Sequence, residues 1–273
     1  WDVGAKKWFA PDAADPTDHR DLLHWTRPAQ NWNFMCAECH TTGLVRGFDV
    51  ATNAYKTTAA RFDVGCQACH GPAAAHIDWV AQPQGVRPRI QGSGFAAPLK
   101  GAPATREIDA CGRCHARRSV LGDGFDHRGR LLDDYVPATL DEGLYHADGQ
   151  VQGEVFEWGS FAQSRMHTKG MKCSDCHDPH ALSTHVPGDG LCTNCHNAVG
   201  PGARAGIDIA GLTRKDYTDR SHHFHTPGGP GSHCVDCHMP STTFLGVDAR
   251  RDHAFPIPRP DLTAVLGTPH ACQ

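Results

Sequence analysis

The sequence predicts a fold made mainly of short α-helices and loops with minor β-hairpins, and three observations support this expectation. A five-residue pattern, Cys-x-x-Cys-His, recurs six times within 273 residues. That leaves about 45 residues for each copy, too few to build a conventional apolar core around every one. The 29 Gly and 19 Pro favour turns over long helices or sheets.

The repeated pattern is the attachment signature of c-type haem, in which two thiols bond to the porphyrin and the adjacent His binds the iron. The six copies are Cys36, Cys39 and His40; Cys66, Cys69 and His70; Cys111, Cys114 and His115; Cys173, Cys176 and His177; Cys192, Cys195 and His196; and Cys234, Cys237 and His238. Zinc half-sites and redox dithiols also use Cys-x-x-Cys, but they do not need a His directly after it. A disulfide framework explains an even cysteine count but not the identical spacing. We therefore expect six haem c groups that replace the missing core.

A thirteenth cysteine, Cys272, stands one residue before the last. A seventh motif cut by the end of the chain would look like this, and a reactive free thiol is the alternative. The chain opens on Trp1 and carries no signal peptide, although haem attachment of this kind takes place outside the cytoplasm. We expect a processed or internal piece of an exported protein, located in the periplasm or outside the cell.

Charge argues against a nucleic-acid ligand, and hydropathy argues against a transmembrane helix. The formal charge is −4 and no basic stripe is present, so nucleic acid is not an expected ligand. No run of 18 apolar residues occurs, which excludes a predicted transmembrane helix. Haem propionates would make the loaded protein more acidic still. Arg117, Arg118, Arg250 and Arg251 are candidates to pair with them, since a guanidinium matches a carboxylate.

Local patterns suggest the individual elements. Residues 1–35 are a loop or short-helix lead-in, and a helical turn is expected at each motif. Residues 44–63 contain two mildly alternating runs, which predict a β-hairpin. The stretch GPAAAHIDWV after His70 predicts a helix with Pro72 near its first turn, and residues 82–104 predict a surface loop.

Motif spacing predicts a division into three parts. Residues 1–125 carry three motifs and form a first haem group. Residues 126–160 form a bridging segment without a motif, which belongs to the longer motif-free stretch 122–160, where we expect small strands. Residues 161–273 carry three further motifs and the cysteine at position 272. The intervals between motifs are irregular, so the chain is not a regular solenoid.

The iron of each haem can take a second axial ligand, and histidine is the expected one. Only six of the 20 His belong to motifs, whereas the chain has four Met, and Met239 directly follows a proximal His. Bis-His coordination and low potentials are therefore expected throughout. The candidate distal ligands are His24, His76, His167, His180, His223 and His253. For each of them a surface or packing His is the alternative, and the cluster around His223 could instead bind an adventitious metal.

Four segments together resemble a known family. They are LHWTRPAQNWNFMCAECHTTGL, GCQACHGPAAAH, YHADGQVQGEVFEWGSFAQSRMHTKGMKCSDCHDPH and CVDCHMPSTTFLGVDARRDHAFPIPRPDL. They are similar to bacterial multihaem c-type cytochromes, which often carry C-terminal tetratricopeptide repeats. The resemblance extends to the tetrahaem cytochrome of ammonia oxidisers and, more loosely, to the hydroxylamine oxidoreductase and pentahaem nitrite reductase group. It implies a multihaem cytochrome c fold with closely stacked haems.

The resemblance also implies a function, electron transfer outside the cytoplasm between redox protein partners on the quinol oxidase or reductase side. Self-assembly, or further haem domains of the same chain, are additional expected partners. The alternative is a multihaem oxidoreductase acting on a small nitrogen or sulfur compound at one five-coordinate haem. No Cys-x-x-Cys-Lys occurs, so the lysine-ligated catalytic haem of the pentahaem nitrite reductases has no counterpart here. A carrier is thus favoured over an enzyme.

Overall fold

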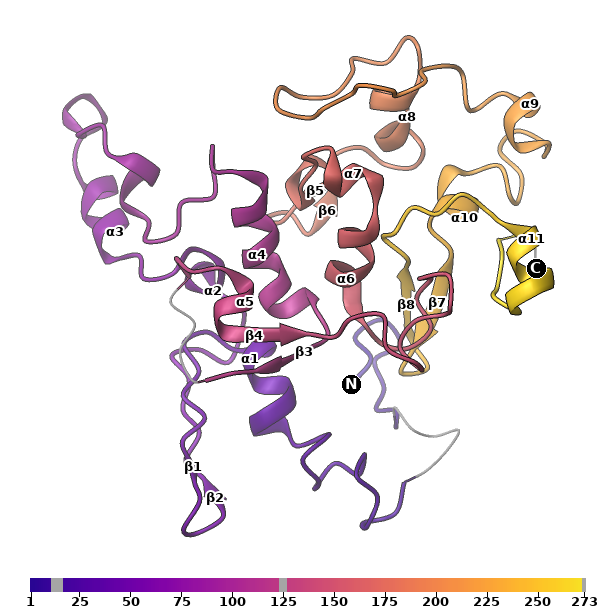
Figure 1. The fold of residues 1–273 in the computed structure, drawn as a ribbon. Coiled ribbons are helices and arrows are strands. Elements are labelled where there is room, and N and C mark those ends of the chain that lie inside the picture. The colour runs from indigo at the N-terminus through magenta and orange to yellow at the C-terminus, as the bar shows by residue number, and fades with distance from the viewer. Residues whose placement is uncertain (11–16, 123–126, 272–273) are drawn as a thin grey trace. The chain divides into compact units, whose positions relative to one another are not determined.

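The computed structural model describes residues 1–10, 17–122 and 127–271, so Cys272 lies outside the described residues. The chain divides into two compact units (Figure 1). Unit 1 comprises Trp1–Cys114 and Arg118–Pro137, and unit 2 comprises His115–Arg117 and Ala138–Gln273.

Short helices and two-stranded antiparallel ladders alternate in both units (Figure 1). The first unit contains a π-helical turn Trp32–Cys36, α1 Ala37–His40, β1 Phe48–Asp49, β2 Ala54–Tyr55, α2 Cys66–His70, α3 Ala74–Ala81, 3₁₀ turns Gln84–Val86 and Gln91–Gly94, α4 Ala104–His115 (its last residue in unit 2), β3 Arg118–Val120, α5 Leu131–Asp134 and β4 Tyr135–Pro137. The second contains α6 Phe156–Gln163, α7 Arg165–Thr168, a 3₁₀ turn Cys173–Asp175, β5 His177–Asp178, β6 Ser183–Thr184, α8 Gly190–His196, α9 Arg220–His223, α10 Cys234–His238, β7 Ser241–Phe244, β8 Asp248–Arg251 and α11 Pro260–Leu266.

The elements expected early in unit 1 are confirmed. β1 and β2 form the predicted hairpin, with Phe48 opposite Tyr55 and their ring centroids 4.8 Å apart. The helix expected after His70 is α3, although Pro72 lies before its N-cap and not in its first turn. Gly71 ends α2 with φ of 68°, a conformation that favours glycine and turns the chain directly after the motif His.

The core of unit 1 is small and lies around α4, α5 and β4. Ile108, Leu131 and Tyr135 are its buried larger apolar side chains, and Leu131 and Tyr135 lie on consecutive elements. β4 pairs with β3 in register Val120 opposite Tyr135. β4 is one of the small strands expected in residues 122–160. Its partner β3 lies before that stretch, because the ladder forms directly after the third motif.

Unit 2 has an even smaller core. Tyr145, Val155, Phe161 and Met171 are its larger buried apolar residues. Among the described residues beyond Met171, only the polar Asp252 and Thr268 are buried. The C-terminal two-fifths of the chain therefore has almost no interior built from its own side chains. No helix in the described ranges is long and apolar enough to cross a membrane.

The expectation of a helical turn at every motif is confirmed, but at the fourth motif the turn is not α-helical. There a 3₁₀ turn, Cys173–Asp175, is followed by β5, and His177 pairs with Thr184 of β6. The reason is local, since Pro179 disfavours helical geometry at the preceding Asp178 and prevents the helix from continuing.

Candidate haem sites

The motif side chains lie mostly at the surface of both units. None of the twelve described cysteines forms a disulfide, and each is at least partly exposed. Large apolar side chains such as Trp25, Phe62 and Val199 are also exposed. Exposed apolar area of this kind needs a cover, and a covalently attached porphyrin is a large apolar plate that would supply it.

The predicted attachment cysteines differ in how far the chain covers them. Cys66 and Cys69 of the second motif are exposed, although burial of its sulfur raises the pKa of the Cys69 thiol. Burial also raises the pKa of Cys176, in the fourth motif, to about 11. Cys237, in α10 beside the proximal His238, is a half-buried thiol. Haem attachment at Cys237 and at the other motif cysteines therefore stays a prediction.

In unit 1 the first and third motifs meet. The Cys39 thiol lies 3.9 Å from the carbonyl oxygen of Cys114. A hydrogen bond between the two thiols lowers the pKa of Cys39 to about 7 and raises the pKa of Cys114. Two attachment thiols in contact bring the edges of the two haem sites together.

Glu38, inside the first motif, binds side chains from other parts of unit 1. Its carboxylate lies 2.5 Å from Arg46 Nη2 and 3.4 Å from Arg118 Nη1, and it accepts a hydrogen bond from the Tyr135 hydroxyl. The Glu38 side chain is only 10% exposed and that of Arg118 8%, and the Arg118 guanidinium lies 4.1 Å from the Tyr135 ring centroid. Burial, together with the hydrogen bond to Glu38, raises the pKa of Tyr135. We call Glu38, Arg46, Arg118 and Tyr135 the Glu38 cluster; it ties the first motif to the strands that follow the third.

The second motif is tied to the third by an arginine. Arg113, between the two cysteines of the third motif, donates from Nη1 to the Ala68 carbonyl of the second at 3.0 Å. Arg118 in turn donates to the Arg113 carbonyl at 2.7 Å. Arg118, a candidate for a haem propionate, is thus committed to protein partners.

In unit 2 the fifth and sixth motifs meet in a similar way. A hydrogen bond between the Cys192 and Cys234 thiols lowers the pKa of Cys192 and raises that of Cys234. Asp189, the N-cap of α8, accepts from the Cys234 amide at 2.9 Å and lies 3.0 Å from His233 Nδ1. We call this contact of Asp189 with His233 and Cys234 the Asp189 brace.

The hydrogen bonds of the motif histidines show which ring nitrogen is left to bind iron. His238 Nδ1 lies 2.9 Å from the Pro256 carbonyl, and His115 Nδ1 lies 2.9 Å from Glu157 Oε2. A ring that donates from Nδ1 presents a lone pair on Nε2, the arrangement usual for a metal-ligating His. The Glu157 side chain is 29% exposed. Burial acts to raise the pKa of this carboxyl, but the hydrogen bond from His115 holds it below its usual value.

Two motif histidines face a second His at a separation that suits a shared iron. The ring centroids of His177 and His253 are 6.3 Å apart, and those of His222 and His238 are 6.2 Å apart with planes 6° from parallel. Imidazole nitrogens bind transition metals at about 2 Å, so two rings on opposite sides of one iron have centroids about 6 Å apart. Burial is the main cause that lowers the pKa of His177 and of His222. The second cause is the charge of the neighbouring His, which is His253 for His177 and His238 for His222.

His253 is held in place by its surroundings. Its Nδ1 lies 2.9 Å from the Arg251 carbonyl, and its backbone amide donates to Ser160 of α6 at 3.2 Å. The adjacent Asp252 is buried and accepts from the amides of Val151 and Ala254. The loop after β8 therefore presents the His253 ring in one orientation.

His223 differs from its neighbour His222 in its ring contacts. Its Nε2 lies 3.1 Å from the Thr218 carbonyl, and its Nδ1 accepts from the amide of His225. With both nitrogens engaged, this ring does not fit a ligand role, whereas His222 faces a motif His. Across the described chain no cluster of three or more His, Cys, Asp or Glu is arranged to hold a metal ion.

The other candidate distal ligands lie in varied surroundings. His76 Nδ1 lies 2.8 Å from the Ser93 carbonyl, and its ring stacks on Phe95, which also contacts His70. His167 packs against Phe161, and its buried Nδ1 has no hydrogen-bond partner in the described structure. His24 Nδ1 lies 2.8 Å from Thr26 Oγ1, and the His180 side chain is 82% exposed. These contacts do not assign any of the four to a motif His, so their roles stay predictions.

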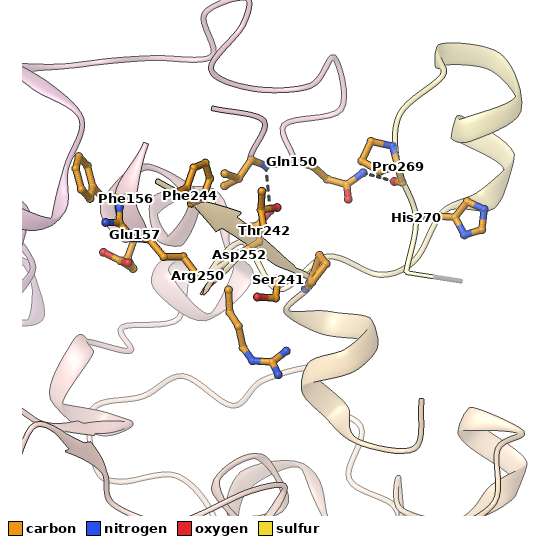
Figure 2. Close-up of a pocket in the computed structure, with 13 residues that line it drawn as sticks. Gln150, Phe156, Glu157, Ser241, Thr242, Phe244, Arg250, Asp252, Pro269 and His270 are labelled. Atoms are coloured by element: carbon orange, nitrogen blue, oxygen red, sulfur yellow. Dashed lines mark hydrogen bonds between the residues drawn. The ribbon is translucent and has the colours of Figure 1, made fainter. Parts of the chain in front are cut away.

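A pocket of about 150 Å³ lies in unit 2 beside Glu157 (Figure 2). Arg250, Asp252 and His270 are among its lining residues. Arg250 is paired with Glu154 at 3.1 Å and Asp248 at 2.6 Å, and Arg251 donates to the carbonyls of Val235 and Met239. Both arginines that line this pocket thus contact protein groups.

Comparisons with known proteins agree with this geometry. The family described as cytochrome c7 and related cytochrome c matches residues 23–116, about a third of the chain, including the first three motifs. The crystal structure of the outer cell wall cytochrome OcwA aligns with 88% of this chain at 21% identity and a TM-score of 0.57. The fold is that of a multihaem cytochrome c. The predicted fold class is thereby confirmed, and the match to the cytochrome c family supports haem c as the cofactor.

The chain spans 59% of the length of OcwA. An undecahaem cytochrome from the S-layer of Carboxydothermus ferrireducens aligns with 89% of this chain and 44% of its own, at 20% identity and a TM-score of 0.38, which is too low to add to the comparison. No curated protein sequence matches the chain.

Proposed function

We propose that this chain transfers electrons outside the cytoplasm through six covalently bound, mostly bis-His, low-potential c-type haems. Each haem, when bound, supplies an iron that alternates between ferric and ferrous states by one electron. The residues of the chain attach, ligate and space these irons. The observation that carries the proposal is the pairing of His177 with His253 and of His238 with His222 at the separation expected for shared irons.

Contacts between motifs support transfer from one site to the next. Cys39 meets Cys114, Cys192 meets Cys234, and Arg113 links the third motif to the second. Short links of this kind hold neighbouring rings near contact, as electron hopping requires. The three-part division by haem groups, with residues 126–160 as a bridge, is part of this proposal.

His253 and His222 are the distal ligands that this proposal assigns to the fourth and sixth sites. His222 takes the place of the candidate His223, because both ring nitrogens of His223 are engaged. At the sixth site Cys234 and Cys237 are the proposed attachment thiols. His24, His76, His167 and His180 are proposed for the remaining sites, and Cys272 for a seventh.

Location and partners follow from the same evidence. The fold neighbour named as an outer cell wall cytochrome supports a place at or beyond the periplasm, with redox proteins on the quinol oxidase or reductase side as partners. Self-assembly and further haem domains are additional proposed partners. Relationship to the tetrahaem cytochrome of ammonia oxidisers and to the hydroxylamine oxidoreductase group is proposed from the sequence resemblance alone.

A pair of adjacent substitutions tests the ligand assignment. In the haem-loaded protein, His222→Ala should convert one low-spin ferric haem to high spin in electron paramagnetic resonance, because the iron loses its second ligand. His223→Ala is the matched control and should leave every signal low-spin. The opposite result would overturn the assignment of His222.

Two measurements on the unaltered protein test the function itself. Pyridine haemochrome counting with intact mass should give six haems, and a seventh would extend the count to Cys272. Ferric spectra should be entirely low-spin. A high-spin haem that binds nitrite or hydroxylamine tightly would favour the oxidoreductase instead.

A further inference from the structure

One motif histidine has a hydrogen-bond partner of a different kind. His115 Nδ1 lies 2.9 Å from the carboxylate of Glu157, whereas His238 Nδ1 lies at the same distance from a backbone carbonyl, that of Pro256. A carboxylate carries a full negative charge, and a carbonyl only a dipole. The two imidazoles therefore differ in the electron density that they can give to a bound metal.

The position of Glu157 is fixed by helix α6. Glu157 is its second residue, and Ser160, one turn later, binds the backbone of His253. The amide of Arg117, two residues after His115, donates to the carbonyl of Val155 at 3.0 Å and ties that segment to the start of α6. The carboxylate thus meets the imidazole through two anchored pieces of backbone, although the His115 side chain is 64% exposed.

We propose that Glu157 is a tuning residue that holds the haem attached at Cys111 and Cys114 at a lower reduction potential than it would otherwise have. This inference rests on the proposed function, because it requires His115 as an iron ligand. The carboxylate accepts a hydrogen bond from Nδ1–H and makes Nε2 a stronger electron-pair donor, and its charge adds to the effect. Both favour the ferric iron, which carries one more positive charge than the ferrous iron. The step is the gain of one electron from a neighbouring site or a chemical reductant, with no bond formed or broken.

The test is a redox titration of the haem-loaded protein followed by its visible spectrum, comparing the unaltered chain with Glu157→Gln. The amide keeps the shape but removes the charge. One transition should move to higher potential, by about tenfold in its equilibrium constant or ~59 mV for one electron. Glu154→Gln is the matched control, because that carboxylate lies on the same segment but is paired with Arg250 and should leave all transitions in place.

Further readouts separate the outcomes. Pyridine haemochrome counting should give six haems in both variants, and low-temperature electron paramagnetic resonance should stay low-spin. Six low-spin haems with unchanged potentials in Glu157→Gln would overturn the tuning role and leave the proposed function intact. Missing haems in the unaltered protein would instead overturn the proposed function. If Glu157→Gln binds haem poorly, Glu157→Asp is the second variant, because it keeps the charge but places it farther from His115. It should shift the reduction potential by less and in the same direction. An unchanged potential would again overturn the tuning role.

Discussion

The two thiol pairs, Cys39 with Cys114 in unit 1 and Cys192 with Cys234 in unit 2, join their motifs by different means. The first is braced by the Glu38 cluster, whose carboxylate and guanidinium groups are almost fully buried. The second is held by the Asp189 brace, in which the Asp189 side chain is 23% exposed and that of His233 51% exposed. Buried charged groups thus support the contact between motifs in unit 1, whereas partly exposed groups support the corresponding contact in unit 2.

The difference follows the distribution of apolar side chains. Ile108, Leu131 and Tyr135 give the first pair a protein interior in which to bury charges. The second pair lies beyond Met171, where the described chain has no buried apolar residue. We expect protein packing to hold the first junction and bound haems to hold the second.

The largest expected effect comes from removing single haems. Cys192→Ser with Cys195→Ser should unfold the chain beyond Met171, because little else orders it, and limited proteolysis should then cut this region as fast as an unfolded chain. Cys36→Ser with Cys39→Ser should leave the region around Leu131 and Tyr135 protected. Mass spectrometry of the fragments locates the cuts. Equal rates of cleavage of both regions in both variants would contradict the expected difference between the two units.

A smaller but still large effect is expected at Glu38. Glu38→Gln should lower the free energy of unfolding by about 3–5 kcal/mol, because it removes the buried carboxylate that Arg46 and Arg118 both contact. The shift in the urea midpoint, followed by circular dichroism of the loaded protein, measures this. Asp63→Asn is the control; it removes an exposed partner of Arg61, and little change is expected.

The smallest effect is expected at the Asp189 brace. Asp189→Asn should cost about 1 kcal/mol, the usual worth of a single hydrogen bond, because solvent can replace what is lost. The same urea titration, read beside that of Glu38→Gln, gives the ratio of the two effects. A loss at Asp189 as large as that at Glu38 would show that the second junction also depends on protein contacts.

The local parts of the fold could be predicted from the sequence. Each motif fixes its own short turn, and alternation in residues 44–63 predicts the β1–β2 hairpin. The helix α3 follows from its composition. In the fourth motif the helical turn stops after Asp175, and Pro179 is a sequence signal against a longer helix.

Long-range partners could not be predicted in the same way. Nothing near Glu38 in the sequence indicates Arg118 or Tyr135, and nothing near His115 indicates Glu157. A partial signal was available, because an acidic residue precedes the second cysteine in three motifs, at Glu38, Asp175 and Asp236. Of these, Asp175 binds Arg204 Nη2 at 2.8 Å and Asp236 accepts from the Gly231 amide. The choice between His222 and His223 depends on the turn of α9, which sequence alone does not orient.

The β7–β8 hairpin and the loop that carries His253 have a consequence for biogenesis. Chains are synthesised from the N-terminus, so His177 emerges well before His253, with two complete motifs between them. Until the hairpin folds, the chain has no His253 to offer to an iron held by His177. On the proposed ligation, coordination at the fourth site is completed late, and the hairpin acts as a timing element in maturation as well as a scaffold in the finished protein.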